Sequence, residues 1–457
     1  MSAWGANAKS CKSLLDRVER NDAGLTELFI LPTKTFGGEE VDRLAQIIEN
    51  GINTHLKKLS ASGHKVPNES LYKLGKAIAS AAAKKTAAPT SLAIGDHTLG
   101  HTGILAFTKG IRECGGITDL EDIDWSWKGI GSSAFEMILE VCGTKSSPKL
   151  RVLNLSRNES IGEQSTENLS FAAFLTHLQV LDLSTCGLSG DFLTQFLVTP
   201  KGVQPNLKQL NLHDNPIGAT GWKAILPLMT RDSSCLEVLN LSKCQIDNDA
   251  MSELSTWSSK SSNSNLRILD LSDNELSAAG IEILSKELSV FPNLVELNLA
   301  GNAIGEQGVQ QLAMALEARH TPQQQGCCCP LKKLDLSRTQ CGHQGAMDMI
   351  SRGRLQSLHL FHNELGSDGF TALASTLQGG HATLEYLDLG GNGAKQDAVV
   401  ELLNALTNNP MENSCLKVLV VGGNEGGDGV EEAAARVGQV HPALDIARDK
   451  KAQRQAG

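Results

Sequence analysis

The chain has 457 residues, of which 40% are hydrophobic, 20% are charged and only 4% are aromatic. A single globular core would be unusually large at this length, and leucine rather than aromatic rings must fill it. The net charge of −10 argues against a general binder of nucleic-acid phosphates. Residues 1–100 contain 13 Lys and Arg and 10 Asp and Glu, so residues 101–457 carry −13. This acidic portion favours a basic partner surface, or simply keeps the protein in solution.

The N-terminal segment, residues 1–24, lacks the apolar stretch of a secretory signal, and no run of about 18 apolar residues predicts a membrane span. The 11 cysteines are scattered and odd in number, so we expect free thiols in a reducing compartment. A cytoplasmic location is therefore expected, with the nucleus as the alternative. An amphipathic stretch at residues 8–20 predicts a helix, and we expect residues 1–24 to cap the chain.

Residues 25–149 contain four weak copies of a leucine-based phrase. These copies start at Leu25, Leu56, Pro89 and Leu120, and the next copy starts at Leu150. None is convincing alone, but the spacing of 30 to 33 residues indicates degenerate repeats.

Residues 150–437 contain stronger copies of the same phrase, L-x-x-L-x-L-x-x-N, as in Leu294, Leu297, Leu299 and Asn302. Most copies are 28 to 30 residues apart, and a phrase recurring at a fixed period predicts a solenoid of leucine-rich repeats. One longer interval contains the polar insert 320–330, which predicts a protruding loop. We expect residues 438–457 to form a C-terminal tail. The ten starts are Leu150, Leu178, Leu207, Leu236, Leu266, Leu294, Leu331, Leu355, Leu384 and Leu416.

Each full repeat predicts a strand, a turn and a helix. The strand residues alternate between leucine and polar side chains, and Val309, Leu312 and Leu316 have helical spacing. This pattern resembles the ribonuclease-inhibitor type of leucine-rich repeat, which Ran GTPase-activating proteins and NOD-like receptors share. The resemblance implies an α/β solenoid of about 14 repeats, a horseshoe with a parallel sheet on its concave face and helices on its convex face.

Polar residues recur in the middle of the predicted strands, where side chains point away from the core. A stripe of Asp and Asn on an uncovered sheet would suit basic side chains of a partner. The alternative is that Leu-Asp-Leu-Ser is common in such repeats whatever they bind. The acidic members that we expect to contact a partner are Asp124, Asp182, Asp270, Asp335 and Asp388.

Aromatic and histidine side chains gather on the same predicted face near the C-terminal end. His359, Phe361, His362 and Tyr386 are expected to form an interaction hot spot. The valines of the following strand, Val418 and Val420, would either join it or pack beneath the C-terminal cap. Trp127 is expected to be exposed near the rim, where it could also contact a partner.

The sequence contains no phosphate-binding loop, no dinucleotide fingerprint and no nucleophile elbow. His97 and His101 have zinc-like spacing but straddle a turn, and Cys327–Cys329 lack a second cluster of ligands. We therefore predict no catalytic residue, no cofactor and no metal, and no nucleic-acid or membrane partner.

The main hypothesis is a non-enzymatic scaffold that binds a protein through the concave sheet and the adjoining loops. One alternative is a regulator of a small GTPase, although no residues match the functional motifs of the Ran activators. A second alternative is a structural subunit of a large or cytoskeletal assembly. The sequence does not specify the partner or the oligomeric state.

Overall fold

A computed structural model describes residues 11–143, 146–163, 176–197, 206–230, 234–258, 264–319, 331–378, 383–407 and 415–448. The chain divides into two compact units. Unit 1 comprises Met1–Ile225 and Ser233–Leu236, and unit 2 comprises Leu226–Asp232 and Glu237–Gly457. The division falls within helix α8 (Gly218–Thr230). The predicted loop at 320–330, with Cys327–Cys329, lies outside the described residues.

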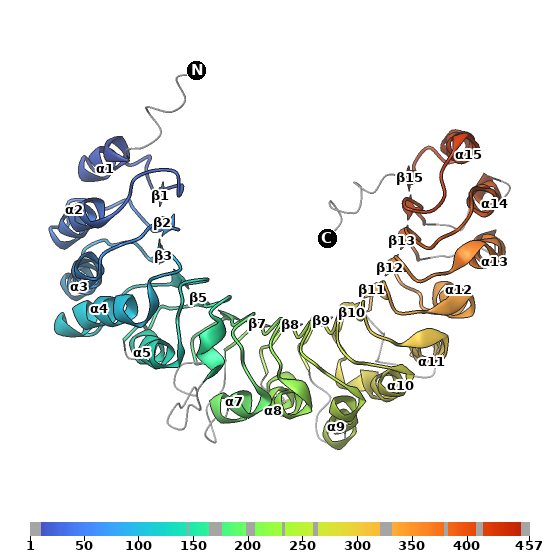
Figure 1. Cartoon of the computed structure of the whole chain (residues 1–457), viewed down its shortest axis with the longest axis horizontal. Helices are drawn as coiled ribbons and strands as arrows, with labels where there is room; N and C mark the ends of the chain where they lie inside the picture. The colour runs from blue at the N-terminus through green and yellow to red at the C-terminus, as the bar shows by residue number, and fades with distance from the viewer. Residues whose placement is uncertain are drawn as a thin grey trace. The chain divides into compact units, whose positions relative to one another are not determined.

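Unit 1 alternates short strands with helices, and strands β1 to β7 pair in parallel and in chain order (Figure 1). Its helices lie on one side of this sheet. The strands are β1 (Glu27–Phe29), β2 (Lys58–Ser62), β3 (Ser91–Gly95), β4 (Asp122–Asp124), β5 (Val152–Asn154), β6 (Val180–Asp182) and β7 (Gln209–Asn211). The helices before α8 are α1 (Lys12–Glu19), α2 (Gly38–Glu49), α3 (Asn68–Lys84), α4 (Gly100–Glu113), α5 (Ser132–Cys142), the 3-10 turn η1 (Glu159–Glu163) and α7 (Gly190–Phe196).

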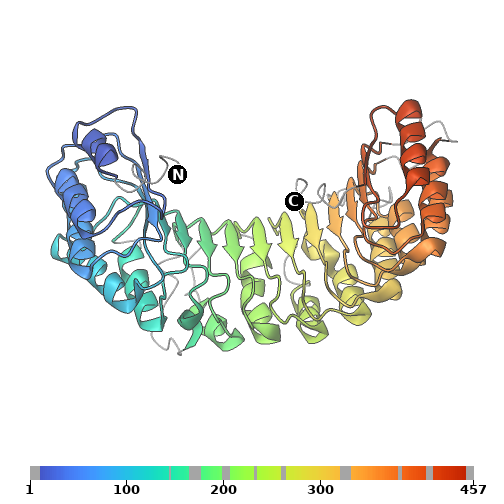
Figure 2. The same ribbon diagram turned by 45° about the horizontal axis from the view of Figure 1, so that its top comes forward.

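Unit 2 repeats the same plan, with β8 to β15 parallel and in chain order (Figure 2). The strands are β8 (Val238–Asn240), β9 (Ile268–Asp270), β10 (Glu296–Asn298), β11 (Lys333–Asp335), β12 (Ser357–His359), β13 (Tyr386–Asp388), β14 (Val418–Val420) and β15 (Asp445–Ala447). The helices are α9 (Asn248–Ser258), α10 (Ala278–Glu287), the 3-10 turn η2 (Leu288–Val290), α11 (Gly305–Ala318), α12 (Gly342–Arg352), α13 (Gly366–Gln378), α14 (Gln396–Thr407) and α15 (Asp428–Val440).

In most of the three-residue strands only the central side chain is fully buried against the core. In β9, Leu269 is fully buried while Ile268 and Asp270 stay partly exposed, and the same alternation recurs in β5, β6, β8, β10, β11 and β12. Successive side chains of a strand point to opposite faces, so two of the three residues look away from the helices. The leucine phrase therefore determines which side chains lie on the face of the sheet that points away from the helices, which we call the strand face.

The helices bury one apolar stripe each, as the spacing predicts. Helix α11 buries Val309, Leu312 and Leu316 against the sheet and its neighbours. In unit 1, α3 and α4 pack closely at Gly75. A Cβ on this residue would lie 2.2 Å from the carbonyl oxygen of Phe107. Only glycine permits that backbone approach.

A ladder of asparagines closes the turn after the strands. Asn274 is buried; its Oδ1 accepts from the N–H groups of Cys244 and Ile246, and its Nδ2 donates to the carbonyl of Leu241. The side chain thus satisfies main-chain groups that have left the strand ladder. We call the place of Asn274 in the repeat the turn position, and the residue just before it the rim position.

The C-terminal end corrects one expectation. The sequence predicts a tail over residues 438–457, but helix α15 extends to Val440 and Asp445–Ala447 form β15, which pairs with β14. Leu444 and Ile446 are buried there, so this segment continues the sheet. The described residues therefore contain 15 strands, one more than predicted. The fold is α/β, a leucine-rich-repeat solenoid whose strands and helices form separate layers.

Candidate functional site

The Asp and Asn residues at the strand ends have a structural task that the sequence analysis did not predict. The Oδ1 atom of each accepts a hydrogen bond from the main-chain N–H two residues later. In β9, for example, the N–H of Ser272 lies 2.9 Å from Asp270 Oδ1, and the Ser272 hydroxyl donates to the same oxygen at 2.6 Å. Such turns explain the Asp-x-Ser spacing, which could have revealed them. The same N–H contact forms at Asp124, Asn154, Asp182, Asn211, Asn240, Asn298, Asp335 and Asp388.

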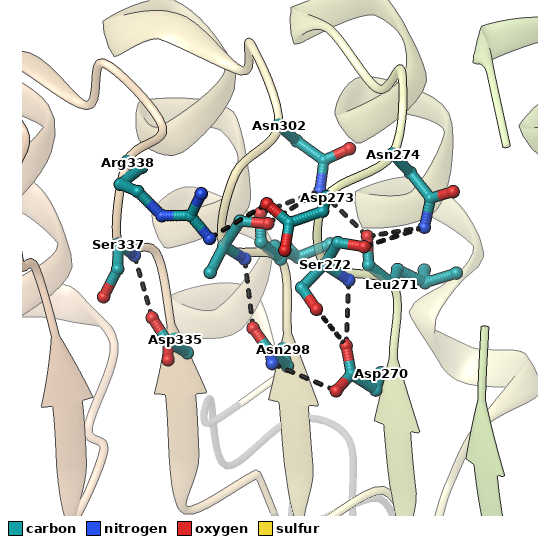
Figure 3. Close-up of polar contacts among 12 residues, drawn as sticks. Asp270, Leu271, Ser272, Asp273, Asn274, Asn298, Asn302, Asp335, Ser337 and Arg338 are labelled. Carbon is teal, nitrogen blue, oxygen red and sulfur yellow. Dashed lines mark hydrogen bonds and ion pairs between the residues drawn. The ribbon is translucent and has the colours of Figure 1, made fainter. Parts of the chain in front are cut away.

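The second carboxylate oxygen distinguishes the members of this stripe. Asp270 Oδ2 accepts from the amide of Asn298 on the neighbouring strand, at 3.1 Å (Figure 3). Asp182 Oδ2 accepts from Asn211 in the same way, at 3.0 Å. Both oxygens of these two aspartates are thus engaged within the sheet. Asp335 is paired in register with His359, and Asp388 with Val420, so neither has an asparagine in the next strand.

A hollow of about 360 Å³ opens on the strand face of unit 2, and we call it the acidic hollow. Four carboxylates and one lysine line the hollow. The lysine, Lys333, has its Nζ 3.9 Å from Glu296 Oε2. Negative charge therefore dominates the hollow. Its charged and aromatic lining residues are Asp270, Glu296, Lys333, Asp335, His359, Tyr386 and Asp388.

Two aromatic rings form one wall of the acidic hollow. The rings of His359 and Tyr386 lie 4.8 Å apart at 33°, and His359 Nε2 lies 3.1 Å from the Ser357 hydroxyl. Burial lowers the pKa of His359, although Asp335 opposes this effect, so the ring is neutral at pH 7. Burial also raises the pKa of Tyr386 to about 12, so its hydroxyl keeps its proton. The wall is thus uncharged at neutral pH.

Asp388 is the most buried carboxylate of the acidic hollow. Asp388 is only 5% exposed, and its Oδ1 accepts a hydrogen bond from the N–H of Gly390 at 2.8 Å. Burial, reinforced by the nearby charge of Asp335, raises the pKa of Asp388 to about 6, despite that hydrogen bond. A cation entering the hollow would favour the ionised form.

The other predicted hot-spot residues lie outside the lining of the acidic hollow. Phe361 is half-buried, and its ring covers the backbone of Gly391, where a Cβ would meet ring atom Cε2 at 2.8 Å. Its ring lies 5.7 Å from that of exposed His362. Val420 is 2% exposed and pairs with Ala447 of β15, so it packs within the sheet. The structure thus brings together His359 and Tyr386, whereas Phe361 and His362 do not line the same hollow.

Glu296 and Lys333 line the acidic hollow but were missed from sequence. Both stand two residues before the Asp/Asn of their strands, where the side chain points to the same face. This alternation was the available signal, and the sequence analysis used it for Tyr386, at the same place in its strand, but not for Glu296 and Lys333.

Two predicted contact residues lie in unit 1. Asp124 and Trp127 both line a second hollow of about 670 Å³, which we call the rim hollow. Trp127 is 62% exposed, and its ring stacks on His97 with centroids 5.7 Å apart. Asp182, in the same unit, does not line this hollow.

Within the described parts of the chain, no group of three His, Cys, Asp or Glu side chains is arranged to hold a metal ion. No described helix is both long and apolar enough to cross a membrane.

Comparison with known proteins gives consistent results. A family model described as Leucine Rich repeat matches residues 146–164, 203–226, 232–255, 262–285, 292–313 and 355–374. The ribonuclease inhibitor of Sus scrofa is 25% identical over 425 residues, which cover 90% of this chain and 82% of the inhibitor. The ribonuclease inhibitor of Mus musculus is 24% identical over 84% of this chain and 87% of its own length. NACHT, LRR and PYD domains-containing protein 12 of Mus musculus is 28% identical over 52% of this chain, but over only 24% of its own length.

Proposed function

Because this chain is a leucine-rich-repeat protein of the ribonuclease-inhibitor-like type, we propose that it is a non-enzymatic scaffold that binds a protein partner. The contact is the strand face of unit 2, centred on the acidic hollow. The group recognised there is a cationic side chain, lysine or arginine, on the surface of the partner.

One observation carries the proposal: the acidic hollow joins two carboxylates that have no asparagine in the following strand to an aromatic wall. Asp335 and Asp388 provide negative charge, and the face of Tyr386 can attract a cation within about 6 Å of its centroid. Four carboxylates against one lysine leave a surplus that a cation would neutralise. Charged groups that have few partners of their own interact most strongly with an incoming ion.

The relatives support a protein as the ligand. The ribonuclease inhibitors of Sus scrofa and Mus musculus act, by name, on a ribonuclease, which is itself a protein. Both are matched over more than four-fifths of their own length, so the resemblance extends over most of the array of repeats. Protein recognition by a preformed repeat surface needs little rearrangement of the backbone.

We also propose a cytoplasmic location. Cys142, Cys186 and Cys341 are buried free thiols, and burial raises the pKa of each to about 12. Cysteines that remain free thiols are typical of proteins kept in a reducing compartment.

The test starts from the partner recovered by affinity purification of the full chain. We expect the double substitution Asp335→Asn/Asp388→Asn to weaken binding by at least about tenfold, because the paired charges are lost. Asparagine keeps the Oδ1 acceptor of each turn, so the fold is retained.

The matched control is Asp182→Asn, which changes the corresponding strand-end residue of β6, whose second oxygen is already engaged by Asn211. The affinity of this variant for the partner should stay within about twofold of wild type, because a carboxylate that already accepts hydrogen bonds within the sheet interacts less strongly with a partner. An equal loss in both variants, or no loss in the double variant, would reject the acidic hollow as the contact. Stimulated GTP hydrolysis in a panel of small GTPases would instead favour the regulator alternative.

A further inference from the structure

The rim position of the repeats imposes a left-handed backbone. Residues with positive φ there include Arg157, Lys243 and His362, and glycine occupies the position at Gly301 and Gly391. Left-handed backbone is unfavourable for any residue with a Cβ, and glycine avoids this cost. Trp127, at φ +54°, has the bulkiest side chain that the described residues hold in this conformation.

Packing does not explain the tryptophan. Trp127 is 62% exposed, and its stacking partner His97 is itself exposed. Trp125, two residues earlier, is 1% exposed and fills the core of the same repeat. A large apolar ring that is held in an unfavourable backbone conformation and left in solvent is typical of a contact residue.

Small residues share the lining of the rim hollow with the ring of Trp127. The lining includes Pro32, Ser62, Gly63 and Trp127. Gly63 packs against Pro32, where a Cβ would lie 3.1 Å from the proline ring, so a larger residue would fill this end. Small side chains let a ligand approach the backbone closely.

Further apolar surface continues from the rim hollow onto β1. Phe29 is 58% exposed and Leu31 is 49% exposed, and Leu31 immediately precedes Pro32. Phe29 is in register with Ser60 of β2, which is in register with Ala93 of β3. This row holds small or apolar residues where later strands present Asp or Asn.

The charges that line the rim hollow balance one another. Asp96 and Asp124 line it together with Lys128 and Arg157, giving equal numbers of each sign. Lys128 is 3% exposed, and its Nζ donates to the Ser126 carbonyl at 2.8 Å; burial lowers its pKa, which Asp124 and Asp96 oppose. Asp96 Oδ1 accepts from the N–H and the hydroxyl of Thr98, at 2.9 and 2.7 Å. Because neither sign of charge prevails, the hollow complements an uncharged ligand.

We propose that the rim hollow binds an extended, uncharged segment of a protein partner, with an aromatic or proline side chain seated on Trp127. This ligand is uncharged, whereas the acidic hollow would take a cation, and the two sites lie in different units. The inference shares with the proposed function only the premise that the chain binds proteins.

The experiment screens a random dodecapeptide phage library on the full-length wild-type chain. The enriched peptides are synthesised with a fluorescent label and titrated by anisotropy. We expect sequences rich in aromatic residues and proline and poor in Lys and Arg. Trp127→Ala should weaken their binding by at least about tenfold, as loss of a buried tryptophan anchor does. Trp127→Phe, which keeps a ring, should retain most of the affinity.

The matched control is Lys243→Ala, which removes an exposed side chain at the same rim position, φ +53°, in unit 2. This variant and Asp335→Asn/Asp388→Asn should bind the peptides like wild type. The proposal is overturned if no peptide is enriched, if Trp127→Ala binds them unchanged, or if Lys- and Arg-rich peptides dominate the pool. A double variant that still binds the basic partner would reject the acidic hollow alone, whereas an ineffective Trp127→Ala would reject only the rim hollow.

Discussion

The two hollows arise from the same repeat geometry but differ in what the exposed positions carry. In unit 2, strands β9 to β13 present Asp270, Asn298, Asp335, His359 and Asp388 on one row, and carboxylates dominate the hollow. In unit 1, the corresponding row begins with Phe29, Ser60 and Ala93, and the charges of the hollow cancel. The leucines and turn asparagines build the frame, so the exposed strand and rim positions are free to set the ligand chemistry.

If the frame is common to both units, breaking it should cost the same in each. Asn215 in unit 1 and Asn274 in unit 2 each accept two main-chain N–H bonds and donate to two carbonyls at 2.8 to 2.9 Å. Replacing either by alanine leaves these buried groups unsatisfied, so we expect a loss of about 3 kcal/mol in each variant. Urea denaturation followed by circular dichroism measures it. Lys243→Ala is the control, and a loss confined to one unit would contradict a shared frame.

The buried carboxylate of Asp388 in the acidic hollow should lower the stability of the fold, and we expect no such penalty from the rim hollow. The fold raises the pKa of Asp388 from 3.8 to about 6, so it disfavours the ionised carboxylate. Stability therefore falls as pH rises from about 4 to 6, and the loss persists above pH 6. Asp388→Asn removes this penalty, so the variant should be more stable at pH 7.5 by up to about 3 kcal/mol, at 1.36 kcal/mol per pKa unit. At pH 3.5 the two proteins should be equally stable. Thermal unfolding at both pH values tests this, and equal stability at pH 7.5 would contradict the cause assigned to the pKa.

Binding at the acidic hollow should depend on pH, whereas binding at the rim hollow should not. Protonation removes the Asp388 charge, so the affinity for the basic partner should fall about tenfold between pH 7 and pH 5. In Asp388→Asn this dependence should be much reduced. Titration calorimetry at the two pH values measures it, with the uncharged peptides of the rim hollow as the comparison. A pH dependence that is unchanged in Asp388→Asn would assign the titrating group elsewhere.

The smallest effect concerns the strained tryptophan. Trp127→Gly relieves the left-handed backbone, so we expect a gain of about 1 kcal/mol in stability together with loss of the peptide ligand. Lys243→Gly should give a similar gain without affecting peptide binding. Thermal unfolding and anisotropy provide the two measurements. A destabilised Trp127→Gly would mean that stacking on His97 outweighs the backbone strain.

Much of the fold was predictable because the leucines recur at a nearly constant interval. The last strand was missed because its segment, residues 445–447, lacks the full phrase, although Leu444 and Ile446 are buried like earlier leucines. The Asp/Asn stripe was predicted, but its role in the turns was not, since a partner contact and a turn acceptor use the same residue types. For Val420 the sequence left open whether the side chain is exposed or packed. The structure shows that it is buried, next to Ala447 of β15.

By itself, the sequence determined the repeat, the strand–turn–helix order and the face on which each side chain lies. These properties follow from local periodicity, because a leucine two positions away in a strand always points to the same side. Only the tertiary structure decided which carboxylates use their second oxygen: Asp182 and Asp270 accept from asparagines about 28 residues away, whereas the following strands place His359 beside Asp335 and Val420 beside Asp388. Hydrogen bonds between repeats depend on register, and register exists only once the repeats have stacked.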